Sequence, residues 1–139
     1  MNNRNLHTLY LSLGSNLGNR RQTMRRAIEL IAEQVGTVDR QSSAIETEPW
    51  GFESPNKFLN MCVRVQTPFS PEQALHATQA IECQLGRTAK SVDGHYHDRP
   101  IDIDLLMYDD LHLSTPELTL PHPFMHERDF VMTPLREIL

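Results

Sequence analysis

Two periodicities alternate along the chain, one typical of strands and the other of helices. Apolar and polar side chains alternate over residues 8–13, which predicts a strand. From Met24 to Val35 the apolar residues are spaced to form one face of a helix, and Gly36 is a natural helix stop. Residues 14–18 lie between these two segments and are rich in turn-forming residues, so we predict a turn there.

The same alternation continues to the end of the chain. Ser70-Pro-Glu-Gln73 has the capping signature of a helix start, with proline at the first helical position, and its helix is expected to end near Leu85. Further strands are expected at 38–47, 57–67, 101–107, 111–113 and 118–120, and a last helix within 127–138. This order matches the ferredoxin-like βαββαβ pattern. We therefore predict an α+β fold with an antiparallel-rich sheet, helices packed against it and short C-terminal additions.

Length and charge limit the classes of function. The 139 residues suit one domain spanning 1–139, and a net charge of −5 argues against a nucleic-acid partner. No apolar run approaches the roughly 18 residues of a membrane span. The N-terminus shows no signal-peptide pattern, so we expect a cytoplasmic monomer with no membrane partner. Cys62 and Cys83 lack the spacing of a metal or disulfide motif and are expected to be buried, reduced thiols.

Two connections are long for a domain of this size. They span 48–57 and 86–100, and connections of this length are uncommon unless they are functional or disordered. Both contain aromatic residues, namely Trp50 and Phe52 in the first and Tyr96 in the second. The sequence therefore favours two lids over two simple spacers.

The strongest chemical signal is the pair Asp102 and Asp104 in the strand expected at 101–107. Alternation along a strand puts both carboxylates on one face, with Cα atoms about 6.5–7 Å apart. Mg²⁺ prefers a few carboxylates together with water and phosphate oxygens. A sheet surface that happens to carry two aspartates is the alternative, but Asp is depleted in strands and the two charges repel. Arg99, three residues upstream, adds the cation that phosphoryl transfer needs.

The segment from Arg99 to Leu106 reproduces the pattern Arg-x-x-Asp-aliphatic-Asp-aliphatic-aliphatic. With it, the chain resembles the 6-hydroxymethyl-7,8-dihydropterin pyrophosphokinase family of folate biosynthesis. Five further segments fit that family in order and spacing, which are 13–17, 47–51, 58–60, 79–87 and 118–130. The resemblance covers nearly the whole chain.

The resemblance implies that the terminal diphosphoryl group of ATP moves to the hydroxymethyl group of 6-hydroxymethyl-7,8-dihydropterin and leaves AMP. Asp102 and Asp104 would bind two Mg²⁺ ions together with ATP. Arg87 and Arg99 would neutralise charge on the transferring group, since such transfer depends mostly on positioning and electrostatics. Asp104 is also a candidate to orient the attacking hydroxyl or to accept its proton.

The same resemblance implies contacts to each substrate. The residues implied for ATP are Leu75, Gln79, Glu82, Arg87, Lys90, Arg99, Leu105, Thr119, His122 and Arg128. The residues implied for the pterin are Thr47, Pro49, Trp50, Phe58, Asn60, Tyr96 and Phe130. A flat heterocycle can stack between aromatic rings while an amide such as that of Asn60 binds its polar edge.

Other functions remain open at this point. A non-catalytic ferredoxin-like module would bind ligands without turnover, because fold alone does not fix function. A different two-metal phosphoryl transferase, such as a nuclease, is disfavoured by the acidic net charge. A zinc site at His122 and His126 lacks a third ligand nearby in the sequence. The 14–18 segment lacks the pattern of a phosphate-binding loop.

Overall fold

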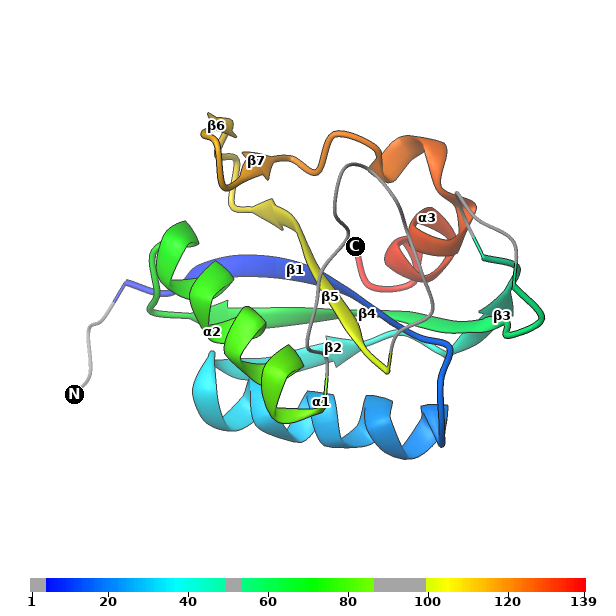
Figure 1. The fold of residues 1–139 in the computed structure, drawn as a ribbon. Helices are drawn as coiled ribbons and strands as arrows, with labels where there is room; N and C mark the ends of the chain where they lie inside the picture. Colours follow the sequence, from blue (N-terminus) through cyan, green and yellow to red (C-terminus); the bar gives the residue numbers. More distant parts are fainter. Residues whose placement is uncertain (1–4, 50–53, 87–99) are drawn as a thin grey trace.

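A twisted antiparallel sheet organises the chain in a computed structural model that describes residues 5–49, 54–86 and 100–139 (Figure 1). Along these residues the elements are β1 (His7–Ser15), α1 (Arg20–Gln34), β2 (Thr37–Gln41), β3 (Ile45–Thr47), β4 (Phe58–Thr67), α2 (Pro71–Gln84), β5 (Asp102–Tyr108), β6 (Leu113–Ser114), β7 (Thr119–Leu120), the 3₁₀ helix η1 (Met125–Glu127) and α3 (Asp129–Arg136). Within this part of the chain the main sheet has the strand order β2-β4-β1-β5, and β3 also pairs with β4. Strands β6 and β7 form a separate small hairpin.

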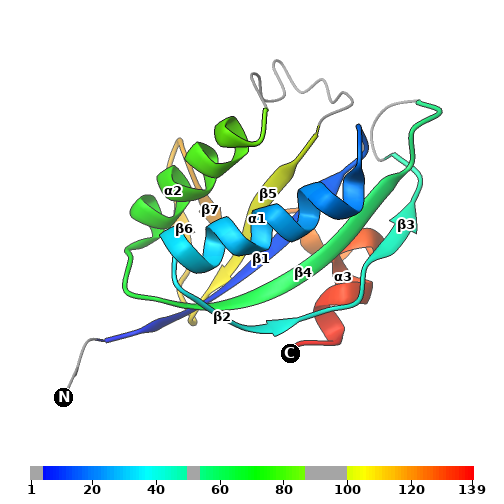
Figure 2. The same cartoon turned by 90° about the horizontal axis from the view of Figure 1, so that it is seen from below.

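Helices cover both faces of the sheet. Helices α1 and α2 lie side by side on one face, and α3 lies on the opposite face (Figures 1 and 2). The main core lies beneath α1 and α2 and includes the fully buried Leu9, Leu11 and Leu13 of β1. A second apolar cluster joins α3 to Cys62 and Leu106 on the other face. The α+β, ferredoxin-like prediction is confirmed.

Local sequence signals explain where α2 begins. The Ser70 hydroxyl accepts a hydrogen bond from the Gln73 backbone N–H at 3.2 Å, and the Gln73 side chain accepts one from the Ser70 N–H at 2.9 Å. This reciprocal pair is a capping box, which satisfies two backbone groups that the first turn leaves without helical partners. Pro71 stands at the first helical position, where its missing N–H has no cost.

The strand expected at 38–47 is interrupted. It divides into β2 and β3, both of which pair with β4. Between the two strands, the β2–β3 segment has one residue more than the facing part of β4. At the interruption, the Ser42 hydroxyl accepts a hydrogen bond from the Cys62 N–H at 2.8 Å. Glu137, beyond the end of α3, accepts hydrogen bonds from both the backbone N–H and the hydroxyl of Ser43. The prediction of a single long strand is therefore wrong, because the distant side chain of Glu137 hydrogen-bonds to the Ser43 backbone at that point.

Two smaller expectations also fail. Gly14 and Ser15 belong to β1 and not to a turn, because both pair with β4. Cys83 is exposed, whereas Cys62 is buried as expected; both thiols are free. In the part of the chain that the structure describes, no helix is both long enough and apolar enough to cross a bilayer.

Candidate active site

The candidate site is built on the sheet face that carries α3. On this face Asp102 of β5 pairs with Gly14 of β1, and Gly14 pairs in turn with Asn60 of β4. A carboxylate and a buried amide therefore lie on the same row of the sheet, separated by a residue without a side chain. Asp104 lies on the next row, opposite Ser12. The prediction that Asp102 and Asp104 share one face agrees with this register, since side chains alternate along a strand.

Gly14 was not identified from the sequence as a site residue. A Cβ atom at this position would lie 2.9 Å from Asn60 Oδ1 and 3.4 Å from Phe58 Cδ1. The absence of a side chain thus lets Asn60 and Phe58 approach the central strand. The available signal was a glycine inside an alternating strand, a pattern that often marks a close approach of another group.

Asn60, Thr47 and Phe58 form one cluster on the β3–β4 pair. The Asn60 amide donates a hydrogen bond to the Thr47 hydroxyl at 2.6 Å, and Thr47 pairs across the ladder with Phe58. Asn60 is 3% exposed and Phe58 is 6% exposed. A buried amide with a fixed partner is pre-organised to recognise a polar edge, because its rotamer is already set.

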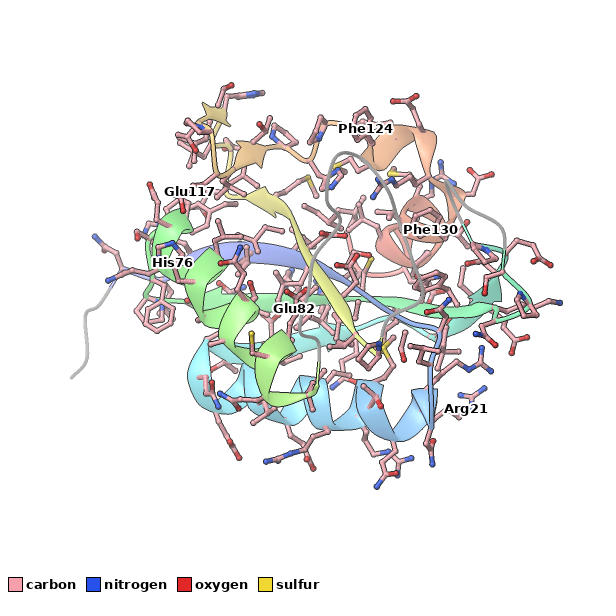
Figure 3. All side chains as sticks on the ribbon, viewed as in Figure 1. Arg21, His76, Glu82, Glu117, Phe124 and Phe130 are labelled. Carbon is pink, nitrogen blue, oxygen red and sulfur yellow. The ribbon has the colours of Figure 1, made fainter. Side chains whose placement is uncertain are left out.

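Glu82 of α2 ties that helix to the strand that carries the aspartates. Its side chain lies on the face of α2 that meets the sheet (Figure 3). The carboxylate accepts a hydrogen bond from the backbone N–H of Ile103 at 2.7 Å, and the residue is 1% exposed. Ile103 stands between Asp102 and Asp104, so this bond fixes the main chain between the two acids. No local pattern predicts this contact, because it joins residues 21 positions apart.

His122 and Arg128 border the site from the C-terminal segment. The backbone N–H of Phe124 donates to His122 Nδ1 at 3.2 Å, which leaves Nε2 as the ring nitrogen that carries the proton. The pKa of His122 is lowered to about 4, mainly by burial and also by the Arg128 cation, while the Asp102 carboxylate partly opposes both effects. His122 is therefore a neutral N–H donor near pH 7.

The guanidinium of Arg128 lies over two aromatic rings. Its guanidinium carbon lies 5.7 Å from the centroid of Phe124 and 5.6 Å from that of Phe130, and the residue is only 7% exposed. Cation–π contacts of this kind hold the planar group in place without consuming its hydrogen-bond donors. Phe130 also packs against the second apolar cluster at the start of α3 (Figure 3).

The other predicted residues fall into three groups. Leu75 and Leu105 are buried in the main core, which leaves little side-chain surface for ATP. Gln79 lies on α2, Thr119 on β7 and Pro49 directly after β3, and none of the three is buried. Most of the segment 86–100 lies outside the described residues. Five predicted residues also lie outside them, namely Trp50, Arg87, Lys90, Tyr96 and Arg99.

The donor set suits a hard cation that binds together with phosphates. Within 5–49, 54–86 and 100–139, no group of three or more His, Cys, Asp or Glu side chains is arranged to hold a metal. Two carboxylates on one face match Mg²⁺, which completes its octahedral shell with waters and substrate oxygens. Asp102 and Asp104 are therefore the residues that could hold a hard divalent cation, with other oxygens completing its shell.

Two curated relatives are similar to this chain over nearly its whole length. A 2-amino-4-hydroxy-6-hydroxymethyldihydropteridine pyrophosphokinase from Porphyromonas gingivalis is 52% identical over 131 residues, which cover 94% of this chain and 89% of that protein. The enzyme of the same name from Bacillus subtilis is 41% identical over 130 residues, covering 93% and 76%.

Solved structures share the fold. A structure of HPPK-DHPS in complex with substrates superimposes with a TM-score of 0.78 at 13% identity, covering 96% of this chain and 40% of that one. A variant of HPPK-DHPS from Plasmodium falciparum gives 0.80 at 16% identity, covering 97% and 42%. The model of the family described as 7,8-dihydro-6-hydroxymethylpterin-pyrophosphokinase matches residues 10–139. With this match and a relative at 52% identity, the chain belongs to that family, as the sequence predicted.

Proposed function

We propose that this chain is a pyrophosphokinase of folate biosynthesis that transfers the diphosphoryl group of ATP to 6-hydroxymethyl-7,8-dihydropterin. The hydroxymethyl oxygen forms a bond to the β-phosphorus of ATP, and the bond from that phosphorus to the oxygen of the α-phosphate breaks. AMP leaves, and the hydroxyl loses its proton. The relatives from P. gingivalis and B. subtilis carry the name of this activity and support the proposal.

One observation of the structure carries the proposal. The row Asp102–Gly14–Asn60 places a carboxylate suited to a phosphate-bound cation on the same row as a buried amide suited to a heterocycle, with only Gly14 between them. An enzyme that joins two substrates needs both reacting groups in one place, since orientation alone can supply about 7–11 kcal/mol of the barrier. A module that only binds one ligand has no need of this juxtaposition.

We assign the metal role to Asp102 and Asp104, with two Mg²⁺ ions that bind together with ATP. When bound, the ions would neutralise phosphate charge in a chain whose own net charge is −5. His122 would donate its Nε2–H to a phosphate oxygen, and the guanidinium of Arg128 would supply a fixed positive charge. Asp104 would orient the attacking hydroxyl or accept its proton.

We assign the pterin to the cluster of Thr47, Phe58 and Asn60, with Phe130 as a second aromatic surface. The hydrogen bond from Asn60 to Thr47 fixes the orientation of the Asn60 amide, and recognition of a polar ring edge requires a fixed orientation.

Product analysis tests the proposal. Purified protein with ATP, 6-hydroxymethyl-7,8-dihydropterin and Mg²⁺ is expected to yield AMP and the pterin diphosphate in equal amounts. Formation of ADP, or no product, would refute it. Binding of both ligands by calorimetry without turnover would favour the non-catalytic module instead.

A further inference from the structure

A single arginine at the start of α1 reaches both strands that carry the proposed pterin residues. Arg20 is the first residue of α1. One guanidinium nitrogen donates to the backbone carbonyl of Lys57 at 3.0 Å, and another pairs with the Glu46 carboxylate at 3.1 Å. Glu46 belongs to β3, and Lys57 directly precedes β4. The planar fork of an arginine suits such a two-point contact, which a lysine cannot reproduce.

The two partners of Arg20 are direct neighbours of pterin residues. Glu46 precedes Thr47 in β3, and Lys57 precedes Phe58 in β4. Side chains alternate along a strand, so Glu46 points to the face covered by α1 while Thr47 points to the opposite face. Arg20 therefore acts from behind the β3–β4 pair and does not itself border the proposed substrate.

Glu46 and the segment just before β4 lie at an open surface, whereas Phe58 and Asn60 of β4 are buried. An open hollow of about 390 Å³ lies between the turn at 16–18, Arg20, Glu46 and residues 55–57. Strand β3 is three residues long, and its only ladder among the described strands is with β4. Where apolar packing is sparse, the position of a segment depends on its polar contacts.

Asn16 supports the same segment from the end of β1. Its amide donates to the backbone carbonyl of Asn56 at 3.2 Å. Lys57 also approaches Glu48, with 3.7 Å between Nζ and Oε1, but these two side chains are 54% and 74% exposed. The Arg20 and Glu46 side chains are 29% and 51% exposed, so this pair is the better shielded of the two.

We propose that Arg20 is a positioning residue for the pterin substrate, which it serves by clamping Glu46 and the Lys57 carbonyl and so holding Thr47, Phe58 and Asn60 in register. This inference rests on the proposed function, because it takes the pterin to bind at those three residues. ATP is assigned to α2, β5 and the C-terminal segment, so the clamp acts on one substrate only.

Steady-state kinetics with each substrate varied in turn test the clamp. Arg20→Ala is expected to raise the KM for the pterin about five- to tenfold, the effect of losing one or two hydrogen bonds, with the KM for ATP changed less than about twofold. Arg20→Lys should recover part of the loss, because an ammonium keeps the charge opposite Glu46 but not the fork. Glu46→Gln should resemble Arg20→Lys.

Arg21→Ala is the matched control. Arg21 is the next residue of α1, exposed on the outer surface (Figure 3), and its loss changes the net charge equally. The Arg21→Ala variant should have the wild-type KM for both the pterin and ATP. The double variant Arg20→Glu with Glu46→Arg should regain pterin affinity relative to Arg20→Glu alone, since the pair is restored with its charges exchanged.

The outcomes separate the clamp from the proposed function. A wild-type protein that forms no pterin diphosphate would refute the proposed function itself. A working wild type whose Arg20→Ala and Arg20→Lys variants keep the wild-type pterin KM would refute the clamp alone. Equal increases in both KM values, or the same change in Arg21→Ala, would also refute it, because either result would indicate a general loss of structure or charge. If Arg20→Ala fails to fold, Arg20→Lys and Glu46→Gln decide the question.

Discussion

Replacing Gly14 by alanine is a demanding test of the site, because it adds one methyl group at its centre. The new Cβ would lie 2.9 Å from Asn60 Oδ1 and 3.4 Å from Phe58 Cδ1. Ordinary contact begins near 3.4 Å, so the Asn60 amide must move by about 0.5 Å. Asn60 is 3% exposed and already holds a 2.6 Å hydrogen bond to Thr47, so it has little freedom to move.

The magnitudes follow from this geometry. Overpacking a buried site costs about 1–3 kcal/mol, and replacing glycine in a strand recovers about 0.5–1 kcal/mol through the lower entropy of the unfolded chain. We therefore expect a net loss of up to about 2.5 kcal/mol of unfolding free energy. A weakened bond from Asn60 to Thr47, at about 1 kcal/mol, corresponds to a rise of about fivefold in the KM for the pterin.

Urea unfolding and kinetics measure the two effects separately. Gly18→Ala is a suitable control, because no atom lies within 4 Å of its added Cβ. That control should lose some stability, since Gly18 has a φ of 68°, but it should keep the pterin KM. In the double variant Gly14→Ala/Asn60→Ala, the loss of unfolding free energy should be smaller than the sum of the two single losses, because the added methyl group no longer meets the Asn60 amide. A Gly14→Ala protein with wild-type stability and wild-type pterin KM would refute the reasoning.

Three further predictions concern charge and thiols. Asp102→Asn and Asp104→Asn should each lower kcat about a hundredfold or more, because a carboxylate that binds the cation is replaced by a neutral amide; an active variant would remove the metal assignment. The pKa of His122 is lowered to about 4, so this side chain binds a proton more readily in the unfolded chain, and its contribution to stability is present above pH 6.5 and is lost as the pH falls toward 4. The melting temperature of His122→Gln should therefore depend less on pH across that window than that of the wild type. An unchanged pH dependence would contradict a neutral histidine. Because burial raises the pKa of the Cys62 thiol to about 12 and Cys83 is exposed, a thiol reagent at pH 8 should modify one cysteine per folded chain and both after unfolding, as mass spectrometry can count.

The elements that the sequence predicted well are those with a strong local signal. The alternation in β1 and β5 and the capping box of α2 each depend on neighbouring residues, and each is found in the structure. The failures depend on distant residues. Ser42 and Ser43 interrupt a strand because Cys62 and Glu137 bond to them, and no local pattern reveals such partners.

The candidate site shows the same division. The shared face of Asp102 and Asp104 follows from a spacing of two in a strand. The contact of Glu82 with the Ile103 amide, the space beside Gly14 and the clamp of Arg20 join elements that are far apart in the sequence. Arg20 is one of four arginines between positions 20 and 26, so its type alone did not distinguish it.

The hydrogen bond from the Ile103 amide to Glu82 links helix α2 directly to strand β5. A strand at the edge of a sheet usually has outward N–H groups that exchange with solvent or pair with another chain. Here a carboxylate from the helix occupies that donor at 2.7 Å, midway between the two aspartates. A displacement of α2 is therefore transmitted to the main chain that spaces the two carboxylates, and the Ile103 amide proton is a natural reporter of that movement in a hydrogen-exchange spectrum.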